Sequence, residues 1–276
     1  GTSIAAKGSF PEIHPLSIGV VGARGGTRFS NEIIDDSDLI FYIGSNTDSA
    51  LTDNWKLPEL DTDKKIIHLD ISEAEVGNNY RTSVVLVGDA KATIRTMLEI
   101  SKKRFKRDYN SIPRIQHIMK EAKEYRESIG KLMESDAKPI HPMRFVKELS
   151  ESIPDEHVIV ADPGVSAIYP SAFYKVRKAG RTIIFNYSLG ALGYAVPASV
   201  GARFARPDEL IVALTGDGSF GFVAGELETI SRVGGKIGII LFNNGSFGWI
   251  RAAMRFSCGS RYFATDFGVV DYVKIA

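Results

Sequence analysis

One pattern recurs along this sequence: a short continuous apolar run, a glycine or polar turn, and then a segment of helical length. Continuous apolar runs of this length predict strands buried on both faces, as in parallel sheets covered by helices. Both halves follow the pattern, so we expect an α/β fold with two doubly wound parallel-sheet domains. The expected strands are Leu16–Gly22, Asp38–Ser45, Lys64–Ser72, Ser83–Asp89, His157–Gly164, Gly180–Asn186, Glu209–Thr215 and Lys236–Phe242.

The composition changes between the two halves. Residues 101–136 are rich in charge and carry only a sparse stripe of isoleucine and methionine, which predicts a helical connector. Pro139 and Pro142 then disfavour continuation of the helix. We therefore expect a first domain over residues 1–100, a connector over 101–137 and a second domain over 138–276.

The totals exclude several classes of protein. The net charge of +1 gives no overall attraction to nucleic acid or to an anionic membrane, and the basic run of Lys102, Lys103, Arg104, Lys106 and Arg107 is expected to be a solvated helix face. No apolar run has the length of a membrane span. A single cysteine cannot form a disulfide within the chain and favours a reduced, cytoplasmic protein. The chain lacks an initiator methionine, so we expect it to derive from a longer polypeptide.

The stretch from Leu214 to Gly248 carries the clearest chemical signal. Gly216-Asp217-Gly218 follows one expected strand, and Asn243-Asn244 follows the next. The glycines are expected to permit a sharp turn, after which one amphipathic helix begins at Ser219 and ends at Gly234. The free N–H groups at its start favour a phosphate.

Adjacent parallel strands bring their carboxyl ends to the same edge of a sheet, where open α/β folds bind ligands. Asp217 and Asn244 are then expected to lie together, and their oxygens suit Mg²⁺ that also holds phosphate. Either motif alone is a common turn or strand end. A Walker loop is excluded, because no Gly-Lys-Ser/Thr follows the glycines.

The pairing of Gly-Asp-Gly with Asn-Asn about two dozen residues later resembles the thiamine diphosphate motif. Other stretches extend the resemblance over nearly the whole chain except the connector. "HPLSIGVVGARGG" and "IIHLDISEAEVG" resemble the middle domain of acetolactate synthases, and "GALGYAVPASVGA" and "ATDFGVVDYVKIA" resemble the segments that flank their motif. The resemblance implies a partial middle domain followed by a truncated diphosphate-binding domain, both from a thiamine diphosphate enzyme acting on 2-oxo acids.

The resemblance also implies roles for single residues. The Asp217 and Asn244 side chains and the Ser246 backbone oxygen would hold Mg²⁺. Leu192 would support the thiazolium ring and bend the cofactor. The other expected cofactor contacts are Gly190, Gly216, Gly218, Ser219 and Gly248.

Two features of the family are absent from this sequence. No segment matches the surroundings of the glutamate that activates the cofactor in a preceding domain, so no catalytic residue is assigned and the chain alone is expected to have little turnover. Ser45–Ser49 stands where the family has a flavin-binding segment, which disfavours FAD. The glycine turn and two acids remain candidates for a nucleotide: Gly22, Gly25, Gly26, Asp70 and Asp89.

The leading hypothesis is an acetolactate synthase-type enzyme of branched-chain amino-acid biosynthesis, which joins a decarboxylated 2-oxo acid to a second carbonyl compound. Val165, Ser166 and Ala167 replace the Gln-His-Gln of that family, and "NNGSFGWIR" is similar to benzoylformate decarboxylase, so a simple 2-oxo-acid decarboxylase stays open. A non-catalytic module and a split enzyme with a separate glutamate-bearing chain also stay open. The intact protein is expected to be a homodimer or tetramer.

Overall fold

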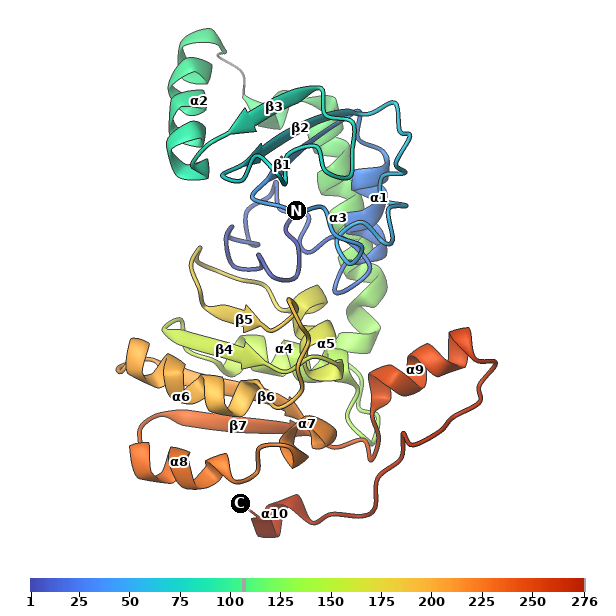
Figure 1. The fold of residues 1–276 in the computed structure, drawn as a ribbon, viewed down its shortest axis with the longest axis vertical. Helices are drawn as coiled ribbons and strands as arrows, with labels where there is room; N and C mark the ends of the chain where they lie inside the picture. The colour runs from blue at the N-terminus through green and yellow to red at the C-terminus, as the bar shows by residue number, and fades with distance from the viewer. Residues whose placement is uncertain (106–107, 276) are drawn as a thin grey trace. The chain divides into compact units, whose positions relative to one another are not determined.

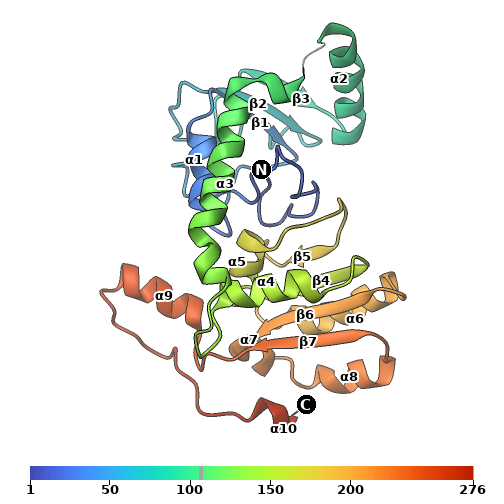
Figure 2. The same cartoon turned by 180° about the vertical axis from the view of Figure 1, so that it is seen from behind.

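The computed structural model describes residues 1–105 and 108–275, so Lys106 and Arg107 of the basic run and the terminal Ala276 lie outside the described residues. The chain forms two compact units: Gly1 with His14–Lys131, and Thr2–Ile13 with Leu132–Ala276. Each unit contains one parallel sheet, which confirms the expected fold class. Figure 1 and the reverse view in Figure 2 show the elements of each. The boundaries at residues 100 and 137 stay predictions.

The first unit has a three-stranded sheet in the order β1-β2-β3, with every pair parallel. The buried side chains of Ile40, Tyr42, Ile66 and Tyr80 form its core. Its elements are α1 (Arg28–Asp35), β1 (Leu39–Ile43), β2 (Lys65–Asp70), β3 (Val84–Val87), α2 (Ala90–Arg104), a short 3₁₀ helix (Tyr109–Ser111) and α3 (Pro113–Met133).

The strand expected over Leu16–Gly22 is wrong. Gly19 and Gly22 have φ angles of 82° and 100°, which an extended strand does not allow. Only Val20 forms an isolated bridge in this segment. Periodicity alone cannot separate an apolar run that packs as a loop from one that pairs as a strand.

The second unit holds a four-stranded parallel sheet in the order β5-β4-β6-β7. Helix α6 packs against β4 and β6, and α4 packs against α5 behind the sheet in the view of Figure 1. Its elements are α4 (Pro142–Ser152), β4 (His157–Ala161), α5 (Val165–Phe173), β5 (Ile183–Phe185), α6 (Ala195–Ala205), β6 (Leu210–Gly216), α7 (Asp217–Gly221), α8 (Glu226–Val233), β7 (Ile237–Phe242), α9 (Gly248–Ser257) and α10 (Tyr272–Ile275).

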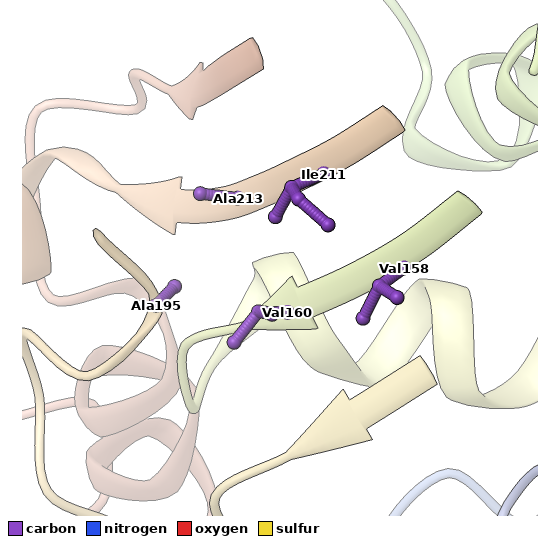
Figure 3. Packing of buried hydrophobic residues seen from close by; sticks show 5 residues of the cluster. All are labelled: Val158, Val160, Ala195, Ile211 and Ala213. Atoms are coloured by element: carbon purple, nitrogen blue, oxygen red, sulfur yellow. The ribbon is translucent and has the colours of Figure 1, made fainter. Parts of the chain in front are cut away.

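Strand order in this sheet reverses at β4. The chain adds β5 on one side of β4 and then crosses to place β6 on the other side. Ligands of open α/β sheets bind at such a reversal, outside the carboxyl ends of the strands. Figure 3 shows the core of this sheet. Val158 and Val160 of β4 and Ile211 and Ala213 of β6 cluster there with Ala195, the first residue of α6.

The single helix expected after Asp217 is two helices. Helix α7 begins at Asp217 rather than Ser219 and is only five residues long, and α8 begins at Glu226. Gly221 and Gly225 weaken helical continuity between them, and turn-type hydrogen bonds such as Val223 N–H to the Phe220 carbonyl (3.0 Å) replace the helical ones.

The first residues of the chain pack into the second unit. Glu12 forms two hydrogen bonds with Val176: its backbone N–H donates to the Val176 carbonyl (2.7 Å), and its side-chain Oε2 accepts the Val176 N–H (3.1 Å). The same Oε2 pairs with Lys7, and both side chains are almost fully buried. Within the described ranges no helix is both long and apolar enough to span a bilayer.

Candidate functional site at the carboxyl edge of the second sheet

Three neighbouring strands of the second unit each end in a side chain that can bind a ligand. Asp162 follows β4, Asp217 follows β6, and Asn243-Asn244 follows β7. The strands are parallel and in register, with Ala161 opposite Leu214 and Gly216 opposite Phe242. These three strand ends therefore lie along one edge, as expected for β6 and β7.

Asp217 is fixed in place by the backbone around it. Its Oδ1 accepts the N–H of Gly218 (2.8 Å), and its Oδ2 accepts the N–H groups of Asn244 (3.0 Å) and Gly245 (2.6 Å). The residue is 4% exposed. Three N–H donors hold this carboxylate in one orientation. The structure thus brings Asp217 to the backbone of Asn244.

The turn after β7 shapes the Asn244 side chain. Its Oδ1 accepts the Ser246 N–H (3.2 Å), and Gly245 has a φ of 65°, which favours glycine. A Cβ on Gly248 would lie 2.5 Å from Asn244 Nδ2, so a side chain at position 248 would displace this amide. The Ser246 carbonyl accepts the Gly248 N–H (2.8 Å) and keeps a second lone pair for another partner.

The donor set at this edge suits a magnesium diphosphate. Among residues 1–105 and 108–275, no three His, Cys, Asp or Glu side chains converge on one point. A metal held here takes one carboxylate, one amide oxygen and main-chain oxygens, and leaves other positions to water and phosphate, which is how Mg²⁺ binds. The residues present fit that group.

Two aromatic rings cover Gly218. Phe247 and Phe267 form an edge-to-face pair with centroids 4.6 Å apart. A Cβ on Gly218 would lie 2.6 Å from Phe247 and 2.9 Å from Phe267, so glycine is required here for close packing. Gly216 has a φ of −87° and open space beside it, so the turn does not depend on a glycine at that position, contrary to expectation.

The segment after α9 folds back onto the turn. The Phe247 N–H donates to the Thr265 carbonyl (2.8 Å), and the Phe267 N–H donates to the Gly245 carbonyl (2.8 Å). Asp266 pairs with Arg251. Residues 265–267 are thereby held against the Asn244 turn, a contact that the sequence pattern did not indicate.

Comparisons with known proteins agree with this geometry. The description "Thiamine pyrophosphate enzyme, C-terminal TPP binding domain" matches residues 162–276, and "Thiamine pyrophosphate enzyme, central domain" matches residues 1–97. The chain carries two domains of the thiamine pyrophosphate enzymes. The first match begins at Asp162, the residue at the end of β4.

Relatives of this chain include acetolactate synthases. It is 33% identical to a "Probable acetolactate synthase large subunit" of Methanocaldococcus jannaschii over 285 residues, which cover all of this chain and 46% of that protein. It is 31% identical to an "Acetolactate synthase" of Mycobacterium leprae, of which it covers 44%. The chain spans about half the length of the curated relatives it matches.

The remaining expected cofactor contacts lie in helix α7 and in the loop before α6. Ser219 is buried in α7. Gly190 has a φ of 73°, and Leu192 is 37% exposed in the loop before α6. At the next position, a Cβ on Gly193 would lie 3.4 Å from the Ser219 carbonyl oxygen, so this loop packs against α7.

Asp162 also lies at this edge, and the sequence pattern did not lead us to predict it as a site residue. It is fully buried, and its Oδ1 accepts the N–H groups of Tyr194 (2.7 Å) and Ala195 (3.2 Å). Burial raises its pKa, while the Thr215 hydroxyl and the backbone N–H groups of residues 193–195 act in the opposite direction. A usable signal was present, because Asp162 follows its buried strand directly, much as Asp217 follows β6.

The nucleotide candidates of the first unit have structural contacts. A Cβ on Gly22 would lie 2.4 Å from the Leu51 carbonyl oxygen. Asp70 Oδ1 accepts the Ser72 N–H (2.9 Å), and Asp89 Oδ1 accepts the Ala92 N–H (2.8 Å) at the start of α2. These contacts explain the residue types without a ligand. The expectation that FAD is disfavoured stays a prediction.

Proposed function

We propose that this chain supplies the metal- and diphosphate-binding half of a thiamine diphosphate site, in an enzyme of the acetolactate synthase type that acts on 2-oxo acids. One observation carries the proposal: the Asp217 carboxylate is buried and held by three N–H groups beside the Asn244 turn. A carboxylate oriented in this way before any ligand arrives costs little to reorganise when a cation binds.

Each residue of the edge has a task in this proposal. Asp217, the Asn244 amide oxygen and the Ser246 carbonyl hold Mg²⁺. Gly218, Ser219 and Gly248 contact the diphosphate, and Gly190 and Gly216 are further contacts of the cofactor. Leu192 supports the thiazolium ring from below.

The bound cofactor supplies the nucleophilic carbon at which a 2-oxo acid loses CO₂, and the chain itself binds and orients that cofactor. The activating glutamate comes from a pyrimidine-binding domain outside these 276 residues, fused or separate. The assembled enzyme is proposed to be a homo-oligomer, and the isolated polypeptide is expected to show little turnover.

A 2-oxo-acid decarboxylase is the second candidate, and Val165 favours it. Its Cγ2 lies 3.7 Å from the position of a Cβ on Gly248, so the segment that departs from the acetolactate synthase pattern borders the site. The Val165 side chain offers no polar group to a second carbonyl substrate. With pyruvate and the complete enzyme, acetolactate as product supports the first candidate and free aldehyde supports the second.

Calorimetric titration with thiamine diphosphate tests the proposal. The chain is expected to bind it in the presence of Mg²⁺ and to lose binding with EDTA. Inorganic pyrophosphate with Mg²⁺ is expected to compete for the same site. A chain that binds neither compound at millimolar concentration contradicts the proposal and leaves a module that serves in assembly.

A further inference from the structure

Asp162 caps a helix whose start has no cap of its own. Helix α6 begins at Ala195, its N-cap residue Tyr194 has helical backbone angles, and no side chain within that turn accepts its first N–H groups. Asp162, 32 residues earlier, accepts the N–H groups of both residues instead. The end of β4 and the start of α6 are thereby joined by one buried carboxylate.

The same carboxylate restrains the loop in front of α6. Asn186 Nδ2 donates to the Ala191 carbonyl (3.2 Å) at one end of this loop. In the middle, Gly193 has a φ of 79° and fits only as glycine, because a Cβ would lie 2.9 Å from Val223. At the far end are the two bonds to Asp162. Leu192 lies between these restraints, and its side chain is partly exposed.

A carboxylate is a costly cap for such a position. Asp162 is 0% exposed, and its polar neighbours are the Thr215 hydroxyl and the N–H groups of residues 193–195. Burying a charged carboxylate carries a desolvation cost that a neutral amide or hydroxyl cap reduces. Asn and Ser cap helices about as well as Asp, so a cap that served the helix alone would not require a buried charge.

We propose that Asp162 is a positioning residue for the cofactor: by holding the N–H groups of Tyr194 and Ala195, it sets the position of Leu192 beside α7, the helix that begins at Asp217. The inference rests on the proposed function, in which Leu192 supports the thiazolium ring. Asp162 acts through this loop and does not touch the diphosphate.

The test separates the two halves of the cofactor. The 276-residue chain is titrated with thiamine diphosphate and, separately, with inorganic pyrophosphate, both with Mg²⁺. The ratio of the two affinities reports the heterocyclic half alone. Leu192→Ala is expected to lower this ratio, and Asp162→Ala is expected to lower it about tenfold with pyrophosphate affinity unchanged, since the loop loses two hydrogen bonds.

Three further variants sharpen the result. Asp162→Asn keeps an acceptor oxygen and is expected to restore the ratio to within about threefold of the unmodified chain. Asp162→Ala with Leu192→Ala is expected to lower the ratio no further than Leu192→Ala, because the two act through one contact. Asp89→Ala removes an acidic helix cap from the first unit and is expected to leave the ratio unchanged.

Each outcome decides the matter. If Asp162→Ala lowers both affinities equally, the positioning role is wrong and the proposed function stands. The same conclusion follows if Asp162→Ala lowers neither affinity while Leu192→Ala lowers the ratio. If the unmodified chain binds neither compound, the proposed function fails instead. If Asp162→Ala does not fold, Asp162→Ser is scored by the same ratio, since its shorter side chain cannot reach both N–H groups.

Discussion

The two parallel sheets share a sequence pattern but differ in how much of it they bury. In the second unit all five residues of β4 and the five central residues of β6 are buried. In the first unit β3 exposes three valines, Val84, Val85 and Val87, and α2 buries none of its residues. An apolar run therefore reports a capacity for burial, which is realised only where helices cover both faces.

The candidate site lies on the better buried sheet. Strands β4 and β6 are the most buried of the molecule's described strands, and they carry Asp162 and Asp217 at their ends. In the first unit, apolar side chains of β1 and α2 instead line an open groove that includes Phe41, Ile43 and Leu98. Rigid support under a site keeps its ligands in place, so we expect perturbations of the second sheet to have larger effects than matched ones in the first.

The largest expected effect concerns charge pairs. Lys7 and Glu12 of the second unit have side chains 1% and 2% exposed, whereas Arg28 and Glu32 of the first are 85% and 59% exposed. Glu12→Gln leaves a buried ammonium without its counter-charge and is expected to cost about 3–5 kcal/mol. Glu32→Gln is expected to cost less than about 0.5 kcal/mol.

The two tryptophans allow each unit to be followed separately in urea. Trp55 lies in the first unit and Trp249 in the second. In a Trp55→Phe chain, Trp249 fluorescence reports the second unit, and a Trp249→Phe chain reports the first. Equal losses for Glu12→Gln and Glu32→Gln are the result that would sink the comparison of charge pairs.

Core truncation comes next in size. Ile211 in β6 is 0% exposed and Val85 in β3 is 57% exposed. Ile211→Ala is expected to cost about 2–5 kcal/mol, because the cavity it leaves cannot be filled by water or by relaxation. Val85→Ala is expected to cost less than about 0.5 kcal/mol. A Val85→Ala loss above 2 kcal/mol in the same urea assay shows that this valine is covered in solution.

The buried lysine also predicts a pH dependence. Burial lowers the pKa of Lys7 to about 8, although Glu12 opposes the shift. Between about pH 8 and 10.5 the unfolded chain holds a proton that the folded chain has released, so the free energy of unfolding rises with pH in this window. Lys7→Met is expected to remove this rise, which is on the order of 3 kcal/mol. If the free energy of unfolding changes equally with pH in the unmodified chain and in Lys7→Met between about pH 8 and 10.5, Lys7 is not the source of the rise.

Ligand binding provides the fourth comparison. Asp217 directly follows β6, and Asp70 is the last residue of β2 in the first unit. Asp217→Asn is expected to weaken Mg²⁺-dependent binding of thiamine diphosphate by roughly 100-fold, since a metal-binding carboxylate becomes neutral. Asp70→Asn is expected to leave the affinity unchanged in calorimetric titration. A comparable loss in both variants would place the cofactor elsewhere.

The sequence predicted those features that depend on neighbours in the chain. The strand ends at Asp217 and Asn244 followed from apolar runs, and their proximity followed from the parallel order of consecutive strands. Contacts between distant residues gave no such signal. The bond from Asp162 to Tyr194 and the pairing of Phe247 with Phe267 depend on how loops return to the edge of the sheet.

Glycine positions account for the other differences. The sequence does not state which glycines adopt a positive φ. A strand was therefore predicted over Leu16–Gly22, although Gly19 and Gly22 bend this segment. Gly218 serves to admit two aromatic rings rather than to permit a turn. The packing of later residues decides such roles, and the local pattern does not contain it.

The smallest expected effect compares two acidic helix caps. Asp89 accepts the Ala92 N–H at the exposed start of α2, whereas Asp162 accepts two N–H groups in full burial. Asp89→Ala is expected to destabilise the first unit by only about 1 kcal/mol, because water can replace the lost acceptor. The loss is measured in urea through Trp55. A loss above about 2 kcal/mol in that unit shows that the cap, and not packing, holds α2 in place. The difference between the two caps would then come from the helices that they cap and not from their burial.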